Sequence, residues 1–153
     1  MTIAGRVLVD RLHVWTWRKE ELCVLCGEEE ESGSHFFFEC KVAWKVWCIC
    51  NKWVGEVIVY HWDARSHFAQ FYLGWTSQRI NSYWGCMWIV VVGEIWKQRN
   101  LVIFENGRID YYEIFTLTKL KAWSWLTSKV KDVSFTYVQW CMDPKTCLKT
   151  IKK

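Results

Sequence analysis

Apolar residues recur at helical spacing over most of the chain, and the clearest run begins near Ser77. Seven residues share one stripe: Ile80, Trp84, Met87, Trp88, Val91, Ile95 and Val102. Asn106-Gly107 is typical of a helix C-terminus, so the pattern predicts a helix over about residues 77–105. The apolar run at residues 86–93 within it is far shorter than the roughly 20 residues of a membrane-spanning helix, which predicts a buried core segment.

Further helices are predicted on both sides of this run. Asp110 and Glu113 form a capping-box-like start to a helix that continues to about Lys131. Near the N-terminus, residues 4–17 form a plausible amphipathic helix. Ser34 is a good N-cap for another helix. The apolar positions of that helix are Phe36, Ala43, Val46, Trp47 and Cys50.

The remaining stretches have weaker patterns. Residues 66–74 predict a short helix, and residues 54–65 predict a connection that contains a possible short strand from Val57 to Tyr60. Residues 133–153 contain Pro144 and are predicted to be partly extended or disordered. The pattern therefore predicts a mainly α protein with little or no sheet.

One cluster of residues indicates chemistry: Cys23, Cys26, His35 and Cys40 have the spacing C-x2-C-x8-H-x4-C. Three thiolates and one imidazole complete the tetrahedral shell that Zn²⁺ prefers, so the motif predicts a closed, structural zinc site. Five residues advance an ideal helix by about 500°, which places His35 and Cys40 about 140° apart. His35 is therefore predicted at the irregular start of a helix and Cys40 one turn inside it, with the metal clamping loop to helix.

The count of eight cysteines also permits a disulfide framework. However, charged side chains interrupt residues 1–21, which do not have the apolar core of a secretory signal. That favours a reducing, intracellular compartment, nucleus or cytoplasm, where such spacing indicates metal binding. Cys48 and Cys50 remain alternative ligands. The cysteines predicted to be free thiols are Cys86, Cys141 and Cys147.

The net charge of +4 is unevenly distributed. Residues 1–40 carry four basic and eight acidic side chains, whereas residues 41–153 carry sixteen basic and eight acidic ones. The acidic run Glu28–Glu31 would repel phosphate, and we interpret it as a solvated loop. The thirteen tryptophans could serve a core, a protein interface or base stacking. For Trp44 and Trp47 the core is favoured over a stacking surface.

Basic residues that could contact nucleic-acid phosphates fall into two groups. Near the metal motif they are Arg6, Arg11, Lys41, Lys45 and Lys52. The second group consists of Lys97, Arg99, Lys119, Lys121, Lys129 and Lys131. The alternative for both groups is an ordinary solvated helix face.

Catalytic chemistry is not predicted. Reverse transcription needs clustered carboxylates that hold two metal ions, but the five aspartates are scattered and no two are adjacent. No glycine-rich phosphate loop or nucleophile elbow occurs in the sequence. His13, His61 and His67 lack ligand-like spacing to cysteine and are interpreted as ordinary surface or core histidines.

The metal motif and its flanks resemble the reverse transcriptase zinc-binding domain of plant LINE-type (non-LTR) retrotransposon polyproteins. The segments that carry the resemblance are Leu22–Gly27, the acidic run, Ser34–Cys40 and Ala43–Trp47. Ile95–Asn100, followed by Phe104, resembles the tail that often follows this domain. The resemblance is good over residues 6–54 and weaker through Leu126.

The resemblance implies a zinc-binding module at residues 1–54, a helical tail region at 55–132 and a C-terminal extension at 133–153. The expected fold is a small Cys3His knuckle, stapled by Zn²⁺ and packed on a helical bundle. Family members usually enter the knuckle after a Leu-Pro-Thr segment, but Pro144 is the sole proline here. The polymerase and endonuclease regions expected upstream are absent, so the chain looks like a C-terminal fragment of a retroelement.

The implied function is a Zn²⁺-binding module of a reverse transcriptase that aids the binding of RNA or single-stranded DNA and has no catalysis of its own. The alternatives are a structural protein-interaction module, whose partner is the upstream polymerase region, and a relic without selected activity. The positive charge beyond residue 40 favours the first, whereas the acidic loop and the excess of aromatic residues favour the second. No membrane partner is predicted.

Overall fold

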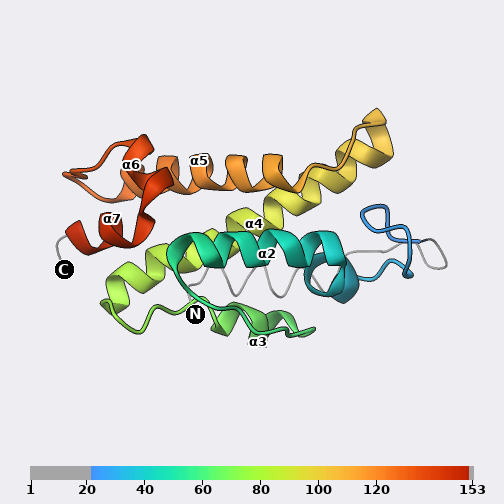
Figure 1. The fold of residues 1–153 in the computed structure, drawn as a ribbon, viewed down its shortest axis with the longest axis horizontal. Helices are drawn as coiled ribbons and strands as arrows, with labels where there is room; N and C mark the ends of the chain where they lie inside the picture. The colour runs from blue at the N-terminus through green and yellow to red at the C-terminus, as the bar shows by residue number, and fades with distance from the viewer. Residues whose placement is uncertain (1–21, 152–153) are drawn as a thin grey trace.

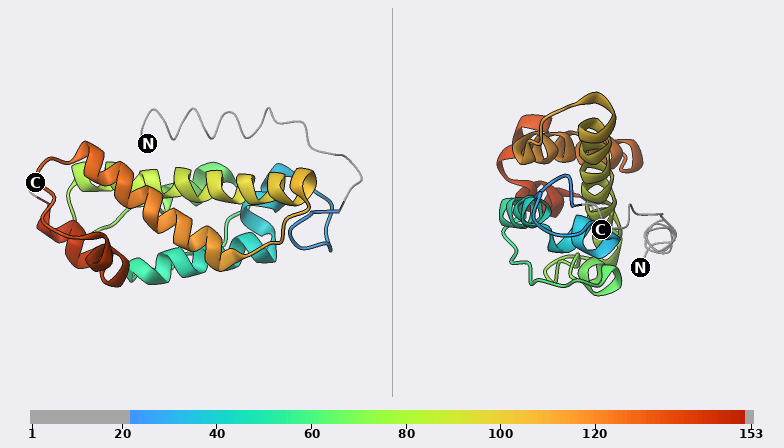
Figure 2. Two further views of the ribbon diagram at one scale, coloured as in Figure 1. Left: turned by 90° about the horizontal axis from the view of Figure 1, so that it is seen from above. Right: turned by 90° about the vertical axis from the view of Figure 1, so that its right-hand side faces the viewer.

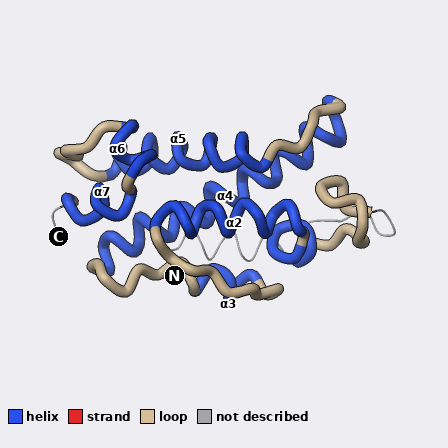
Figure 3. The backbone as a smooth tube through the Cα atoms, in the orientation of Figure 1, coloured by secondary structure: helices blue, strands red, loops and turns tan. Residues whose placement is uncertain are grey.

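The computed structural model describes residues 22–151, and Figures 1 and 2 show an elongated bundle whose longer helices run along the molecule. Its elements are the π-helix η1 (His35–Glu39) and the α-helices α2 (Lys41–Val54), α3 (Ala64–Ala69), α4 (Gln78–Glu105), α5 (Tyr111–Lys129), α6 (Tyr137–Met142) and α7 (Pro144–Thr150). The described residues contain no strand (Figure 3). The predicted mainly α fold, with its Cys3His cluster, is confirmed. The helix predicted over residues 4–17 lies outside the described residues.

The longest helix, α4, begins and ends where the sequence predicts. The hydroxyl of Ser77 accepts a hydrogen bond from a main-chain N–H of the first turn at 3.3 Å. At the other end, Asn106 takes the left-handed conformation with φ of 56°, and Gly107 follows where the side chain of Leu101 leaves no room for a β-carbon. The apolar run at residues 86–93 lies in the middle of this helix. None of the described helices is long and apolar enough to cross a membrane.

Helices α2 and α5 pack against each other and against α4 (Figure 2). Asp110 caps α5 by accepting hydrogen bonds from two main-chain N–H groups, which confirms the predicted start. The end of α2 is marked by Gly55, whose φ of 83° suits glycine. One hydrophobic core runs through α2, α4 and α5 and includes residues of α6 and α7. The division into segments 1–54, 55–132 and 133–153 stays a prediction.

The C-terminal region is helical where the sequence interpretation expected extended or disordered chain. Helix α6 starts with a capping box, in which Thr136 Oγ1 accepts from the N–H of Gln139 at 3.3 Å and the Gln139 amide oxygen accepts from the N–H of Thr136 at 2.8 Å. Pro144 occupies the first turn of α7, where its missing N–H leaves no hydrogen bond unmade. Trp140 anchors α6 in the core. The prediction is therefore wrong for residues 137–142 and 144–150, because Thr136 and Pro144 each begin a helix.

The segment from Val57 to Tyr60 is an extended loop, and the strand considered for it does not form. The side chain of Gln70 takes the place of a neighbouring strand: its Nε2 donates to the carbonyl of Val59 at 2.8 Å, and the N–H of Val59 donates to its Oε1 at 2.7 Å. Val57 is 90% exposed. β-Branched residues favour a strand only where another strand can pair with them. The short helix predicted over 66–74 is α3, displaced toward the N-terminus.

Aromatic rings enclose His67 on α3. The centroid of its ring lies 4.4 Å from that of Trp47 and 4.7 Å from that of Phe38. Its Nδ1 accepts a hydrogen bond from the indole N–H of Trp88 at 2.9 Å, while Nε2 has no hydrogen-bond partner among the described residues. Burial lowers the pKa of His67 to about 3, so the folded protein holds a neutral imidazole.

We expect His67 to make the protein about 2 kcal/mol less stable at pH 5 than at pH 7. The unfolded histidine has a pKa near 6.5 and gains a proton below that pH, whereas the folded one does so only near pH 3. Its contribution is therefore intact above pH 6.5 and is lost progressively as the pH falls. Urea unfolding of wild type and His67→Gln at pH 5 and pH 7 measures this difference in the free energy of unfolding. Glutamine still offers Trp88 a hydrogen-bond acceptor but does not titrate. The same pH dependence in both proteins would contradict the prediction.

Candidate metal centre

The loop before η1 closes on itself and brings its two cysteines together. The N–H of Cys23 donates to the carbonyl of Glu29, and the N–H of Gly27 donates to the carbonyl of Cys23, both at 2.7 Å. Gly27 has a φ of 68°, a conformation that glycine adopts without steric cost and that the sharp turn after Cys26 requires. An isolated antiparallel bridge between Leu22 and Glu30 closes the base of the loop.

The second pair of ligand candidates brackets the π-helix. His35 begins η1, and its N–H donates to the hydroxyl of Ser32 at 3.1 Å. The N–H of Cys40 donates to the carbonyl of His35 at 2.6 Å, a π-type bond that spans five residues. Cys40 then has a ψ of 132°, which ends η1 and lets α2 begin as a separate helix. His35 lies at the helix start as predicted, but Cys40 lies at the junction and not one turn inside a continuous helix.

The four side chains converge on one point. Their ligand atoms all lie within 4.8 Å of one another. The sulfur atoms of Cys23 and Cys40 are 3.9 Å apart, and Cys26 Sγ lies 3.3 Å from His35 Nε2. Around a tetrahedral Zn²⁺ with ordinary bond lengths, two sulfurs lie about 3.8 Å apart and a sulfur and a nitrogen about 3.5 Å apart. The two separations are close to these values, and the other pairs, which lie within 4.8 Å, would have to close by about 1 Å or less around the ion.

A disulfide framework does not occur in this structure. All eight cysteines lie in the described range and are free. The distance between the sulfurs of Cys23 and Cys40 is nearly twice the roughly 2.05 Å of a disulfide bond. Cys50, considered as an alternative ligand, is buried in α2, where desolvation raises the pKa of its thiol to about 12. Cys86, Cys141 and Cys147 are free thiols, as predicted.

The hydrogen bond between the two buried thiols, Cys23 and Cys40, shifts their pKa values in opposite directions. Cys23 donates to Cys40, which raises the pKa of Cys23 and lowers the pKa of Cys40, while burial opposes ionisation of both. Cys40 is thus the thiol of this pair that loses its proton first. Cys23 and Cys40 are fully buried, whereas Cys26 and His35 are partly exposed. The donor set fills a tetrahedron from within the protein, which suits a structural ion.

A buried ion pair ties the loop to α4. Arg99 donates to Glu31 through both Nε, at 3.0 Å, and Nη2, and each side chain belongs to a residue that is 6% exposed. The guanidinium carbon of Arg99 also lies 5.0 Å from the ring centroid of Trp96. The interpretation of the acidic run as solvated loop is therefore wrong for Glu31. Because these partners are 68 residues apart, no local pattern pointed to the pair.

The five candidate phosphate contacts near the metal motif do not share one environment. Arg6 and Arg11 are outside the described residues. Lys41 forms an ion pair with Glu28 of the metal loop, and this partner raises the pKa of Lys41. The remaining two, Lys45 and Lys52, are exposed on α2.

The second group of candidates also does not form one open patch. Lys97 and Lys121 both approach Glu94, a buried carboxylate of α4. Arg99 is buried with Glu31, as described above. Lys119 lies over the ring of Phe115, at 4.4 Å from its centroid. The other two members, Lys129 and Lys131, are exposed near the end of α5.

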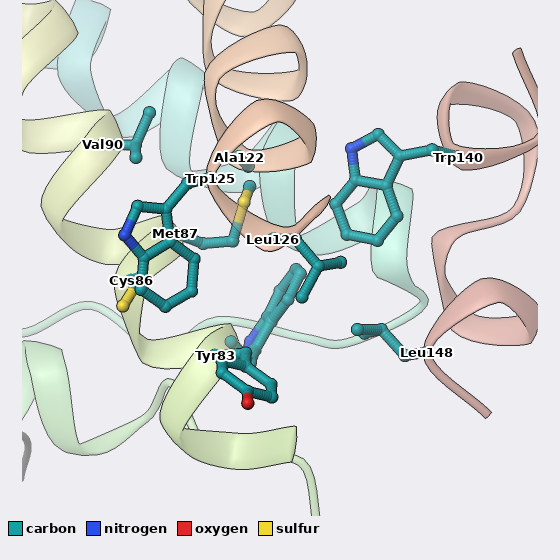
Figure 4. Close-up of a pocket in the computed structure, with 10 residues that line it drawn as sticks. Tyr83, Cys86, Met87, Val90, Ala122, Trp125, Leu126, Trp140 and Leu148 are labelled. Atoms are coloured by element: carbon teal, nitrogen blue, oxygen red, sulfur yellow. The ribbon is translucent and has the colours of Figure 1, made fainter. Parts of the chain in front are cut away.

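A small cavity between α4, α5, α6 and α7 is part of the core (Figure 4). Its volume is about 10 Å³, and side chains such as Met87, Leu126 and Trp140 line it. An apolar space of this size stays dry and is too small for a ligand.

Comparison with known families agrees with the metal geometry. Residues 2–47 match the model of a family described as zinc-binding in reverse transcriptase, and all four ligand candidates lie in the matched segment. The matched part of the chain is similar to a zinc-binding domain, which is not itself a catalytic class. Searches of curated proteins and of solved structures gave no significant match.

Proposed function

We propose that the chain is a zinc-binding module of a plant LINE-type reverse transcriptase, derived from the C-terminal part of the polyprotein, that aids nucleic-acid binding without catalysis of its own. The observation that carries the proposal is the convergence of Cys23, Cys26, His35 and Cys40 at tetrahedral spacing. The family similarity at residues 2–47 supports the choice of Zn²⁺ over other ions. When bound, Zn²⁺ supplies a cross-link between the loop and the start of α2.

The surrounding residues hold the four candidate ligands in place. Cys23 and Cys40 supply buried thiol groups, and the turn at Gly27 and the π-helix hold the four donors in place. Glu31 and Arg99 fix the loop against α4. Such a closed donor set excludes substrate from the ion, which supports a structural role.

The first test is the zinc content of the reduced protein by native mass spectrometry, before and after treatment with a chelator. We expect one zinc ion per chain and a loss of helical circular dichroism when it is removed, because ligand binding and local folding are coupled. Protein that contains no zinc after expression and refolding in zinc-supplemented medium would overturn the metal assignment.

A second candidate function is a protein-interaction module, favoured by one observation. The loop over residues 57–62 exposes several apolar side chains, among them Val57 (90%) and Trp62 (65%). Exposed apolar groups that gather in one segment often mark a protein interface. If the zinc-loaded protein fails to bind single-stranded RNA at low salt, this second candidate replaces the nucleic-acid half of the proposal.

A further inference from the structure

The two ends of the long axis differ in charge. The metal loop lies at one end, and α7, the 130–136 loop, the start of α4 and the end of α2 lie at the other (Figure 1). A hollow of about 580 Å³ beside His35 is lined by acidic side chains of the metal loop and by Glu39. Phosphate groups are repelled from such a surface. Nucleic acid that binds this chain is therefore expected to avoid the open face of the metal site.

The opposite end is basic. The described basic residues there are Lys52, Arg79, Lys129, Lys131, Lys145 and Lys149. The ten residues after Asp143 contain four lysines and no acidic side chain. Asp143 itself caps α7 by accepting from the N–H of Thr146 at 3.0 Å. We call the group formed by Trp75, Arg79, Lys131, Lys145 and Lys149 the basic end.

A cleft opens within the basic end. It has a volume of about 450 Å³, and Arg79 and Lys131 line it together with Asp132, Ser134 and Thr150. This volume lies in the range of pockets that hold one small organic group, such as a nucleotide. The two cations and the Ser134 hydroxyl offer donors to a phosphate, whereas the Thr150 hydroxyl donates to the carbonyl of Cys147 at 2.7 Å and Asp132 offers none.

Trp75 lies next to two lysines of α7. Lys145 Nζ is 5.1 Å and Lys149 Nζ 5.5 Å from its ring centroid. The indole N–H donates to Glu56 at 2.8 Å, which fixes the orientation of the ring. An oriented, half-buried indole with two ammonium groups over its ring has the two components that single-strand binding proteins combine: a stacking surface and phosphate contacts.

The lysines of the basic end are available for phosphate. In the part of the chain that the structure describes, neither Lys145 nor Lys149 forms an ion pair, nor does Lys131. In contrast, Lys97 and Lys121 approach the carboxylate of Glu94. Nucleic acid carries cations along its phosphates, and a lysine that neutralises a phosphate releases these cations to solution, which drives binding at low salt.

We propose that the basic end binds the backbone of single-stranded nucleic acid, with Trp75 as the stacking surface and Lys145, Lys149, Arg79 and Lys131 as phosphate contacts. This inference rests on the proposed nucleic-acid function and assigns its surface. Of the basic residues considered from the sequence, this surface keeps Lys131 and adds Arg79, Lys145 and Lys149, all far from the metal loop.

The test uses the full zinc-loaded chain and a fluorescein-labelled, unstructured 20-nucleotide oligouridine, with anisotropy measured over a series of salt concentrations. Lys145→Gln with Lys149→Gln is expected to weaken binding roughly tenfold near 0.1 M salt and to lower the salt slope by about 1.4, or 0.7 for each contact. Trp75→Leu is expected to weaken binding about tenfold and to leave the salt slope unchanged.

The matched control is Lys41→Gln with Lys45→Gln, which removes the same charge from exposed positions near the metal loop and is expected to leave the slope unchanged. If wild type binds but the control lowers the slope and the Lys145/Lys149 variant does not, the basic end is excluded and the nucleic-acid function stands. If wild type does not bind the oligonucleotide at 50 mM salt, the nucleic-acid function fails as well. Circular dichroism of each variant checks the fold, since Lys41, Lys45 and Lys149 are exposed but Lys145 is half-buried beside Trp75.

Discussion

Replacing Cys40 with serine is expected to abolish stoichiometric zinc binding and to lower the free energy of unfolding by about 5 kcal/mol or more. Cys40 lies at the junction of η1 and α2, so the loss of its thiolate removes the metal cross-link between the loop and the start of α2. Structural zinc contributes roughly 10 kcal/mol or more to the folding of small zinc domains, which is comparable with the whole stability of an ordinary protein. For a chain of this length the change corresponds to a fall in Tm of about 10–20 °C. Native mass spectrometry and thermal unfolding measure the two effects.

Cys86→Ser is the matched control for this variant. Its thiol lies on α4 away from the metal site and donates to the carbonyl of Ser82 at 3.5 Å, a hydrogen bond that a hydroxyl can also make. We expect this variant to keep one zinc ion and to lose no more than about 1 kcal/mol. A Cys40→Ser protein with full zinc content and wild-type Tm would show that the cluster is not the binding site.

Replacing Arg99 with methionine is expected to destabilise the fold by about 3–5 kcal/mol and to weaken zinc binding about tenfold or more. The change leaves the carboxylate of Glu31, which is 6% exposed, without its guanidinium partner in a buried position. Because Glu31 belongs to the metal loop, the loss of this anchor also increases the freedom of the ligands. Urea unfolding and competition with a zinc chelator measure the two effects.

Two further variants isolate the cause. Lys97→Met removes the same charge from the same helix, but Lys97 is exposed and its Nζ lies 3.6 Å from Glu94 Oε1. We therefore expect the free energy of unfolding to fall by less than about 1 kcal/mol. Adding Glu31→Gln to Arg99→Met neutralises the stranded carboxylate and is expected to restore part of the lost stability. Equal costs for Arg99→Met and Lys97→Met would mean that the buried pair contributes little.

The parts of the fold that could be predicted from sequence are those encoded by neighbouring residues. Ser77, Asp110 and Asn106 mark helix ends because each side chain or backbone conformation acts on its own turn. The Cys3His set was recognisable for a similar reason, since its spacing places four donors within one short segment. Such local signals do not depend on the rest of the chain.

The features that sequence reasoning missed depend on distant partners or on small local differences. No residue near Glu31 in the sequence indicates that Glu31 is buried in an ion pair with Arg99 of α4. The π-helix includes a hydrogen bond that spans five residues, from the N–H of Cys40 to the carbonyl of His35, which an ideal α-helix calculation cannot anticipate. Pro144 can either end or begin a helix, and the burial of Trp140 against α5 favours the second.

The pairing between Gln70 and Val59 has a consequence for handling the protein. A single amide satisfies the main chain of one residue, and no backbone–backbone hydrogen bond is made by residues 57–62 within the described part of the chain. The sequence Val-Ile-Val-Tyr-His-Trp contains no Lys, Arg, Asp or Glu and is rich in β-branched and aromatic residues, the composition that stacks into cross-β assemblies. Aggregation through this exposed loop, rather than melting of the helices, will therefore set the upper limit on the concentration at which the protein stays in solution.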